Sequence, residues 1–204
     1  MRNVAAANTA VAVAGSTSGV GSTGCALCAK GTYNDETTQS TCKPCAAGKY
    51  GSAQGLSSAQ CSGECSPGTF SNASSVECTN CPAGKYEPRT GSIACNTNGD
   101  GACPAGTYSH ERSAGCLECL AGYVGEAEGL TTRFCSGICP PGKYSLAGAS
   151  ECVNCLAGRF GQNGASSAGC DAACPKGKYS TEGSTGEERR GAKRISRCQL
   201  RRCF

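Results

Sequence analysis

Large apolar side chains are sparse in this chain and recur at one place of a short repeated segment. The tetrapeptide Cys-x-x-Gly occurs nine times, and in eight cases an aromatic residue follows the glycine by two positions. The intervening stretches are rich in Ser, Gly and Thr and lack the 3.6-residue period of an amphipathic helix. The pattern predicts short, irregular β-strands joined by turns, with almost no helix. The tetrapeptides begin at Cys28, Cys45, Cys65, Cys81, Cys103, Cys119, Cys139, Cys155 and Cys174, and the aromatic residues are Tyr33, Tyr50, Phe70, Tyr86, Tyr108, Tyr144, Phe160 and Tyr179.

Each of these segments, here called a half-repeat and named by its first cysteine, runs to a further cysteine. Short Cys-x-x-Cys joints alternate with wider joints, so a full repeat is a pair of half-repeats that recurs every 35–38 residues. A fixed period of this kind is typical of repeat architectures. The later cysteines of the half-repeats are Cys42, Cys61, Cys78, Cys95, Cys116, Cys135, Cys152 and Cys170.

Composition limits how such a chain can be stabilised. Leu, Ile, Val and Phe together number 22 of 204 residues, and there is no Trp. This is too little apolar volume for the core of a large globular enzyme, and no catalytic or cofactor-binding residues stand out. The 20 cysteines indicate that cross-links replace the core. We therefore expect a small disulfide-rich repeat protein, elongated into a rod of neighbouring units.

Sequence alone does not fix which cysteines pair, because even six cysteines allow 15 pairings. The scheme that we prefer closes each half-repeat on itself, and Cys174 would then pair with Cys198 or Cys203. The predicted pairs are Cys28–Cys42, Cys45–Cys61, Cys65–Cys78, Cys81–Cys95, Cys103–Cys116, Cys119–Cys135, Cys139–Cys152 and Cys155–Cys170.

One segment resembles a known family. Cys65-Ser-Pro-Gly-Thr-Phe70, followed by Cys78-x-x-Cys81-Pro-Ala-Gly-Lys-Tyr86, is similar to the ephrin type-A/type-B receptor-like cysteine-rich repeat. That repeat is grouped with the growth-factor-receptor, tumour-necrosis-factor-receptor-like and EGF-like cysteine-rich modules. The resemblance implies extracellular, disulfide-rich modules in long arrays, and it carries over no ligand-binding residue. The chain departs from the family pattern at Asn96–Ala102 and after Ser180.

The sequence gives only weak indications of metal-binding or reactive sites. Cys25, Cys28, Cys42 and Cys45 approach the spacing of a zinc ribbon, but an unbroken periodic series of joints favours disulfides over metal. His110 stands in a polar loop, where a solvated side chain is the ordinary case. The segment 96–101 offers oxygen donors for calcium but lacks a bidentate Glu, so we interpret it as a turn. We expect no metal and no cofactor.

Asn72-Ala73-Ser74 is the single N-x-S/T motif of the chain. It lies in a Ser-rich loop of a half-repeat, which makes Asn72 a candidate glycosylation site in an extracellular protein.

The two ends differ from the repeats. Met1 and Arg2 precede an Ala-rich stretch that ends in Ala12-Val13-Ala14, which mimics a secretory signal but also fits a low-complexity spacer. Residues 187–204 carry seven basic and two acidic residues, which account for the net positive charge of the chain. The remaining residues are therefore close to neutral overall, and we expect no nucleic-acid partner. No apolar stretch is long enough to span a bilayer. The predicted organisation is 1–24 leader or linker, 25–61, 62–102, 103–135 and 136–170 as repeats, 171–186 as the start of an incomplete fifth repeat, and 187–204 as a basic tail.

These features predict a non-enzymatic extracellular module of a secreted or cell-surface protein, part of a longer array. We expect it to act as a rod that binds another extracellular protein or a glycan. Two alternatives remain open: a structural stalk without a specific ligand, and an intracellular zinc-cluster protein.

Overall fold

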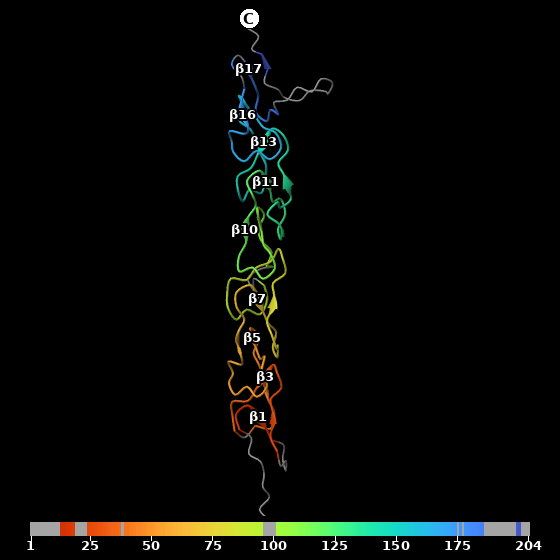
Figure 1. The fold of residues 1–204 in the computed structure, drawn as a ribbon, viewed down its shortest axis with the longest axis vertical. Coiled ribbons are helices and arrows are strands. Elements are labelled where there is room, and N and C mark those ends of the chain that lie inside the picture. Colours follow the sequence, from red (N-terminus) through yellow and green to blue (C-terminus); the bar gives the residue numbers. More distant parts are fainter. Residues whose placement is uncertain are drawn as a thin grey trace, which may run out of the picture. The chain divides into compact units, whose positions relative to one another are not determined.

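A computed structural model describes residues 13–18, 24–37, 39–95, 101–174, 176, 178–185 and 199–200. Its regular structure consists of two-residue β-strands in antiparallel pairs (Figure 1). No helix occurs in these residues. The strands are β1 Ser16–Thr17, β2 Ala26–Leu27, β3 Thr32–Tyr33, β4 Lys43–Pro44, β5 Lys49–Tyr50, β6 Gly63–Glu64, β7 Thr69–Phe70, β8 Thr79–Asn80, β9 Thr107–Tyr108, β10 Leu117–Glu118, β11 Tyr123–Val124, β12 Gly137–Ile138, β13 Lys143–Tyr144, β14 Val153–Asn154, β15 Arg159–Phe160, β16 Ala172–Ala173, β17 Lys178–Tyr179 and β18 Gln199–Leu200.

The strand pairs from β3–β4 to β15–β16 are built from the same two places of the repeat. The first strand holds the two residues after the Cys-x-x-Gly turn, and the second holds the two residues before the next half-repeat's cysteine. In the β5–β6 pair, for example, Lys49 faces Glu64 and Tyr50 faces Gly63. The turn glycine reverses the chain before the first strand, with φ between 79° and 86° in the eight half-repeats from Cys28 to Cys155. Glycine has no Cβ and adopts this left-handed conformation at little steric cost.

The chain divides into two compact units. The first contains residues up to 81 together with 87–101 and 112–114, and the second contains 82–86, 102–111 and residues from 115 onward. The contacts described below each lie within one unit. A search of the described residues finds no helix that is long and apolar enough to cross a membrane.

Cysteine sulfur, rather than aromatic rings, forms the buried centre of each half-repeat. The first cysteine is fully buried in all eight half-repeats from Cys28 to Cys155. Most of the repeated aromatic residues are only half-buried, with Tyr108 buried and Tyr179 exposed. In the Cys119 half-repeat, which lacks the aromatic residue at this place, Val124 is buried instead. The fold is therefore a small disulfide-rich repeat structure with irregular β-strands, as the sequence predicts.

The first strand lies inside the segment 1–24, for which a leader or linker is predicted. Ser16 and Thr17 pair with Leu27 and Ala26, and Gly15 has a φ of 85°, like the turn glycines. The amide of Cys28 donates to the carbonyl of Gly15 at 2.9 Å. Residues 13–18 thus adopt the conformation of a half-repeat turn. The sequence obscures it because this register places Ala12 where the other half-repeats have their first cysteine.

Candidate functional site: the disulfide ladder and its loops

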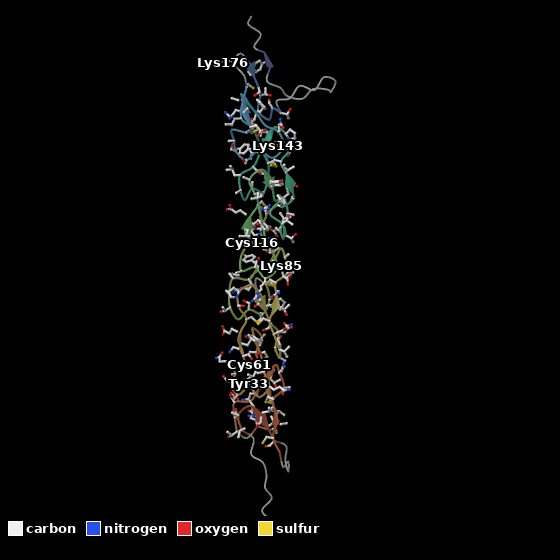
Figure 2. The ribbon with its side chains drawn as sticks, in the orientation of Figure 1. Tyr33, Cys61, Lys85, Cys116, Lys143 and Lys176 are labelled. Atoms are coloured by element: carbon white, nitrogen blue, oxygen red, sulfur yellow. A yellow bond between two sulfur atoms is a disulfide. The ribbon has the colours of Figure 1, made fainter. Side chains whose placement is uncertain are left out.

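Every half-repeat from Cys28 to Cys155 is closed by one disulfide between its own first and later cysteines (Figure 2). These are the same pairs as in the scheme that closes each half-repeat on itself. Cys174 is also disulfide-bonded, and both partners expected for it lie outside the described residues. The bonds join Cys28 to Cys42, Cys45 to Cys61, Cys65 to Cys78, Cys81 to Cys95, Cys103 to Cys116, Cys119 to Cys135, Cys139 to Cys152 and Cys155 to Cys170.

Gly15 and the turn glycine of each half-repeat from Cys28 to Cys139 pack against a loop two half-repeats further along the chain. The loop residue that each of them meets, here called the stacking residue, also has a positive φ, between 61° and 77°. A Cβ built on the turn glycine would lie 2.6–3.0 Å from the carbonyl carbon of the stacking residue and closer still to its oxygen. Only glycine fits such a backbone-to-backbone approach. The pairs are Gly15–Gly55, Gly31–Ser74, Gly48–Gly91, Gly68–Arg112, Gly84–Gly129, Gly106–Gly148, Gly122–Gly164 and Gly142–Gly183.

Backbone hydrogen bonds hold this arrangement. The stacking residue donates its amide to the first cysteine of the preceding half-repeat, as Gly148 does to the Cys119 carbonyl at 3.0 Å. The turn glycine donates to the sixth residue after the next half-repeat's first cysteine, as Gly106 does to Gly125 at 2.8 Å. Buried backbone groups are therefore paired although the strands are only two residues long.

That sixth residue, here called the inner position, is buried in every half-repeat and is always small or polar. Serine at this position donates its hydroxyl to a backbone carbonyl of the preceding half-repeat, as Ser109 does to Lys85 at 2.9 Å. Asn34 makes the same contact through its amide, to Ser16. The inner residues are Asn34, Gly51, Ser71, Glu87, Ser109, Gly125, Ser145, Gly161 and Ser180.

Glu87 is the one acidic residue among these inner positions and is fully buried. Its Oε1 accepts hydrogen bonds from the amide and the guanidinium Nε of Arg89, at 3.0 and 3.1 Å. Burial raises the pKa of the Glu87 carboxyl, but the hydrogen bonds from Arg89 and Ser92 outweigh it, so the pKa lies below its ordinary value. Oε2 is buried and accepts no hydrogen bond from the described residues.

A second charged cluster is exposed. Lys43 Nζ lies 2.8 Å from Asp35 Oδ1 and 2.8 Å from Glu36 Oε1. Hydrogen bonds from Lys43 lower the pKa values of both carboxyls, and those carboxyls raise the pKa of Lys43. Exposed ion pairs of this kind contribute little to stability. The cluster therefore marks the surface of the Cys28 half-repeat rather than a reactive site.

Exposed Leu, Ile, Val and Phe side chains occur in both compact units. Among the described residues, the first unit has four of them and the second has seven, which are 41–60% exposed. The ring of Phe134 lies 5.0 Å from that of Tyr123, and the Arg133 guanidinium lies 5.0 Å above Phe134. A shallow hollow of about 390 Å³ beside β12 is lined by both apolar and charged residues, including Ile138, Lys143 and Glu151. The seven apolar residues are Leu117, Leu120, Phe134, Ile138, Leu146, Val153 and Leu156.

The remaining candidate sites of the sequence have the following places in the structure. His110 is exposed, 5.4 Å from the ring of Tyr108. Cys28 and Cys42 form one disulfide and Cys45 belongs to another, so they do not form the thiolate cluster of a zinc site. Within the described residues, no three His, Cys, Asp or Glu side chains are grouped so that they could hold a metal. Residues 96–100 and the basic tail lie outside the described residues, apart from 199–200.

The stacking residues and the inner positions were missed by sequence reasoning. Six of the eight stacking residues are glycine, and each lies in the loop before the later cysteine of its half-repeat. This recurring second glycine is the signal that could have identified them. The spacing from the first cysteine varies between half-repeats, and Ser74 and Arg112 interrupt the series. The inner positions alternate among Ser, Gly, Asn and Glu, which obscures their common environment.

Comparisons with known proteins agree with this architecture. A segment is 41% identical over 70 residues to Signal peptide, CUB and EGF-like domain-containing protein 2 of Homo sapiens, covering 33% of this chain and 7% of that protein. Another match is 35% identical over 72 residues to Sushi, von Willebrand factor type A, EGF and pentraxin domain-containing protein 1 of Mus musculus, covering 35% of this chain and 2% of that protein. The chain thus matches only a small part of these relatives.

The central part of the chain matches a known family. Residues 68–106 match the family described as tyrosine-protein kinase ephrin type A/B receptor-like. They include the turn glycines Gly68, Gly84 and Gly106 and the Cys81–Cys95 disulfide. Residues 68–106 are therefore similar to the ephrin type-A/B receptor-like cysteine-rich repeats, which confirms the resemblance drawn from the sequence.

Proposed function

We propose that this chain is a non-enzymatic extracellular module that presents exposed side chains, on a cross-linked frame, for recognition of another protein or a glycan. The observation that carries the proposal is the closure of each half-repeat by its own disulfide. Closing a loop of about 15 residues removes roughly 3 kcal/mol of unfolded-state freedom in the chain-entropy model. The frame is thereby fixed without a large apolar core, and the loop side chains are left available for contacts.

The disulfides also support the compartment that we propose. Disulfides persist in oxidising environments, such as the secretory pathway and the cell exterior, and are rare in the cytosol. The printed name of one relative includes a signal peptide together with CUB and EGF-like domains. We therefore place the module in a secreted or cell-surface protein, where it forms part of a longer repeat array.

The exposed apolar side chains favour recognition over a featureless stalk. Seven of them belong to the second compact unit. The Leu120 amide donates to the carbonyl of Arg133 at 3.1 Å, which brings the loops of Leu120 and Phe134 together, and neighbouring exposed apolar groups are typical of binding surfaces. We assign the binding role to this unit, with Leu120 and Phe134 as its main apolar contacts.

The experiment measures binding of the secreted, disulfide-bonded chain, multimerised on a fluorescent scaffold, to intact cells and to an array of extracellular glycans. The double variant Leu120→Ser/Phe134→Ser is compared with Val76→Ser/Ile93→Ser, which removes exposed apolar groups from the first compact unit. Saturable binding that is lost in the first variant and kept in the second is the expected result. Equal binding by both variants would overturn the assignment of the site, and no saturable binding would favour the stalk.

A further inference from the structure

Two stacking residues depart from the glycine rule. In six half-repeats the residue at this left-handed position is glycine, whereas the Cys65 half-repeat has Ser74 with φ 63° and the Cys103 half-repeat has Arg112 with φ 61°. A residue with a Cβ pays a steric cost in this conformation. Strained residues persist where another requirement holds them, and an observed outlier therefore points to a function.

The sequence gives a reason for a serine at position 74. Ser74 is the third residue of the chain's single N-x-S/T motif, Asn72-Ala73-Ser74, whose hydroxyl residue is part of the signal for N-glycosylation. A glycine would suit the backbone better but would abolish the motif. Glycosylation of Asn72 would explain why serine, rather than glycine, occupies this stacking position.

The local structure leaves the motif accessible while its backbone is fixed. The side chains of Asn72, Ala73 and Ser74 are exposed. The Ser74 amide donates to the carbonyl of Cys45 at 2.9 Å, and the Ser75 amide donates to the carbonyl of Asn72 at 3.3 Å. The backbone of this loop contacts Gly31, whereas its side chains face solvent. A bulky substituent on Asn72 therefore has room without disturbing the contact with Gly31.

We propose that Asn72 carries an N-linked glycan and that Ser74 is retained at its left-handed position because the glycosylation motif needs its hydroxyl. The inference rests on the secretory compartment of the proposed function. In the reaction a bond forms between Asn72 Nδ2 and the anomeric carbon of an oligosaccharide. The bond from that carbon to a polyprenyl diphosphate donor breaks, the diphosphate leaves, and a proton of Nδ2 passes to a base of the transferase.

The chain as a whole is directed through the secretory pathway of a eukaryotic cell, and the peptide with Asn72 is analysed by mass spectrometry before and after enzymatic removal of N-glycans. Three variants accompany it. Ser74→Thr preserves the motif, Ser74→Gly removes it while improving the backbone, and Arg112→Gly improves an equivalent backbone position outside any motif.

The expected result is a glycan on Asn72 in the wild type, in Ser74→Thr and in Arg112→Gly, and none in Ser74→Gly. After deglycosylation, Ser74→Gly should raise the folded-to-unfolded ratio by roughly two- to fivefold, since the left-handed cost is partly offset by the freedom of glycine in the unfolded chain. A secreted, disulfide-bonded wild type with unmodified Asn72 would overturn the glycan and leave the proposed function standing. Free thiols would overturn both, and an unchanged Ser74→Gly stability would refute the explanation of Ser74.

Discussion

Replacing Gly106 by alanine tests whether stacking between alternate half-repeats stabilises the protein. A Cβ at Gly106 would lie 2.9 Å from the carbonyl carbon of Gly148, so the loop of the Cys139 half-repeat has to move away. Alanine at a φ of 84° costs about 0.5–1 kcal/mol net, because the left-handed cost is partly offset by the freedom that glycine has in the unfolded chain. Displacing the loop also weakens its hydrogen bond to Cys119, worth about 1 kcal/mol. The strain of overpacking adds about 1–3 kcal/mol. The expected total is about 2.5–5 kcal/mol.

Gly158 provides the matched control. Its φ is 81°, its amide donates to Ser180 at 3.0 Å and its carbonyl accepts from Cys174 at 2.8 Å, as the corresponding groups of Gly106 do with their partners. A Cβ at Gly158 would meet no atom of the described residues within 4 Å. Gly158→Ala should therefore cost only the net backbone contribution, about 0.5–1 kcal/mol.

The assay is guanidinium chloride unfolding with the disulfides intact, combined with amide hydrogen exchange. Exchange at the Gly148 amide is informative because repeat proteins open locally before they unfold as a whole. Gly106→Ala should speed exchange there by at least about 30-fold relative to Gly158→Ala, as expected for a difference of about 2 kcal/mol. Equal losses of stability in the two variants would refute the stacking argument.

Three further predictions follow from single residues. Arg112→Gly should raise the free energy of unfolding by about 0.5–1 kcal/mol in thermal or chemical unfolding, and an unchanged value would mean that its left-handed backbone carries no strain. Ser109→Ala should lower it by about 1–2 kcal/mol because the carbonyl of Lys85 loses a buried donor, whereas exposed Ser150→Ala should change it little. The folded pKa of Glu87 lies below its ordinary value, so its contribution to stability is present above the unfolded pKa and is lost as the pH falls through the folded pKa. Between about pH 5 and about pH 3, the free energy of unfolding should therefore fall more in the wild type than in Glu87→Gln. Parallel curves for the two proteins would contradict the lowered pKa of Glu87.

The cysteine and glycine pattern was sufficient to predict the repeat, the strands and the turns, because these depend on residues close together in the chain. The first cysteine, the turn glycine and the strand after it keep a fixed spacing, so the local geometry repeats with the sequence. The preferred scheme of one disulfide within each half-repeat also agrees with the bonds of the structure.

The packing between half-repeats was less predictable. The stacking contact joins backbone atoms about 40 residues apart, as in Gly106 and Gly148, and leaves no side-chain pattern. The aromatic residues are the largest apolar groups of the half-repeats, yet it is the first cysteines that are fully buried. The sequence predicts a leader or linker over residues 1–24, where the cysteine of a half-repeat is absent, whereas the backbone of residues 13–18 follows the repeat.

Mapping the disulfides of the secreted chain tests the central claim most directly. A non-reduced digest is analysed by mass spectrometry, and zinc is measured in the same sample. The account predicts the eight linked peptide pairs from Cys28–Cys42 to Cys155–Cys170, each within one half-repeat, a further link at Cys174, and no zinc. Links that join different half-repeats would contradict the closure of each half-repeat by its own disulfide. Free thiols with about one zinc per four cysteines would contradict the fold, the compartment and the proposed function together.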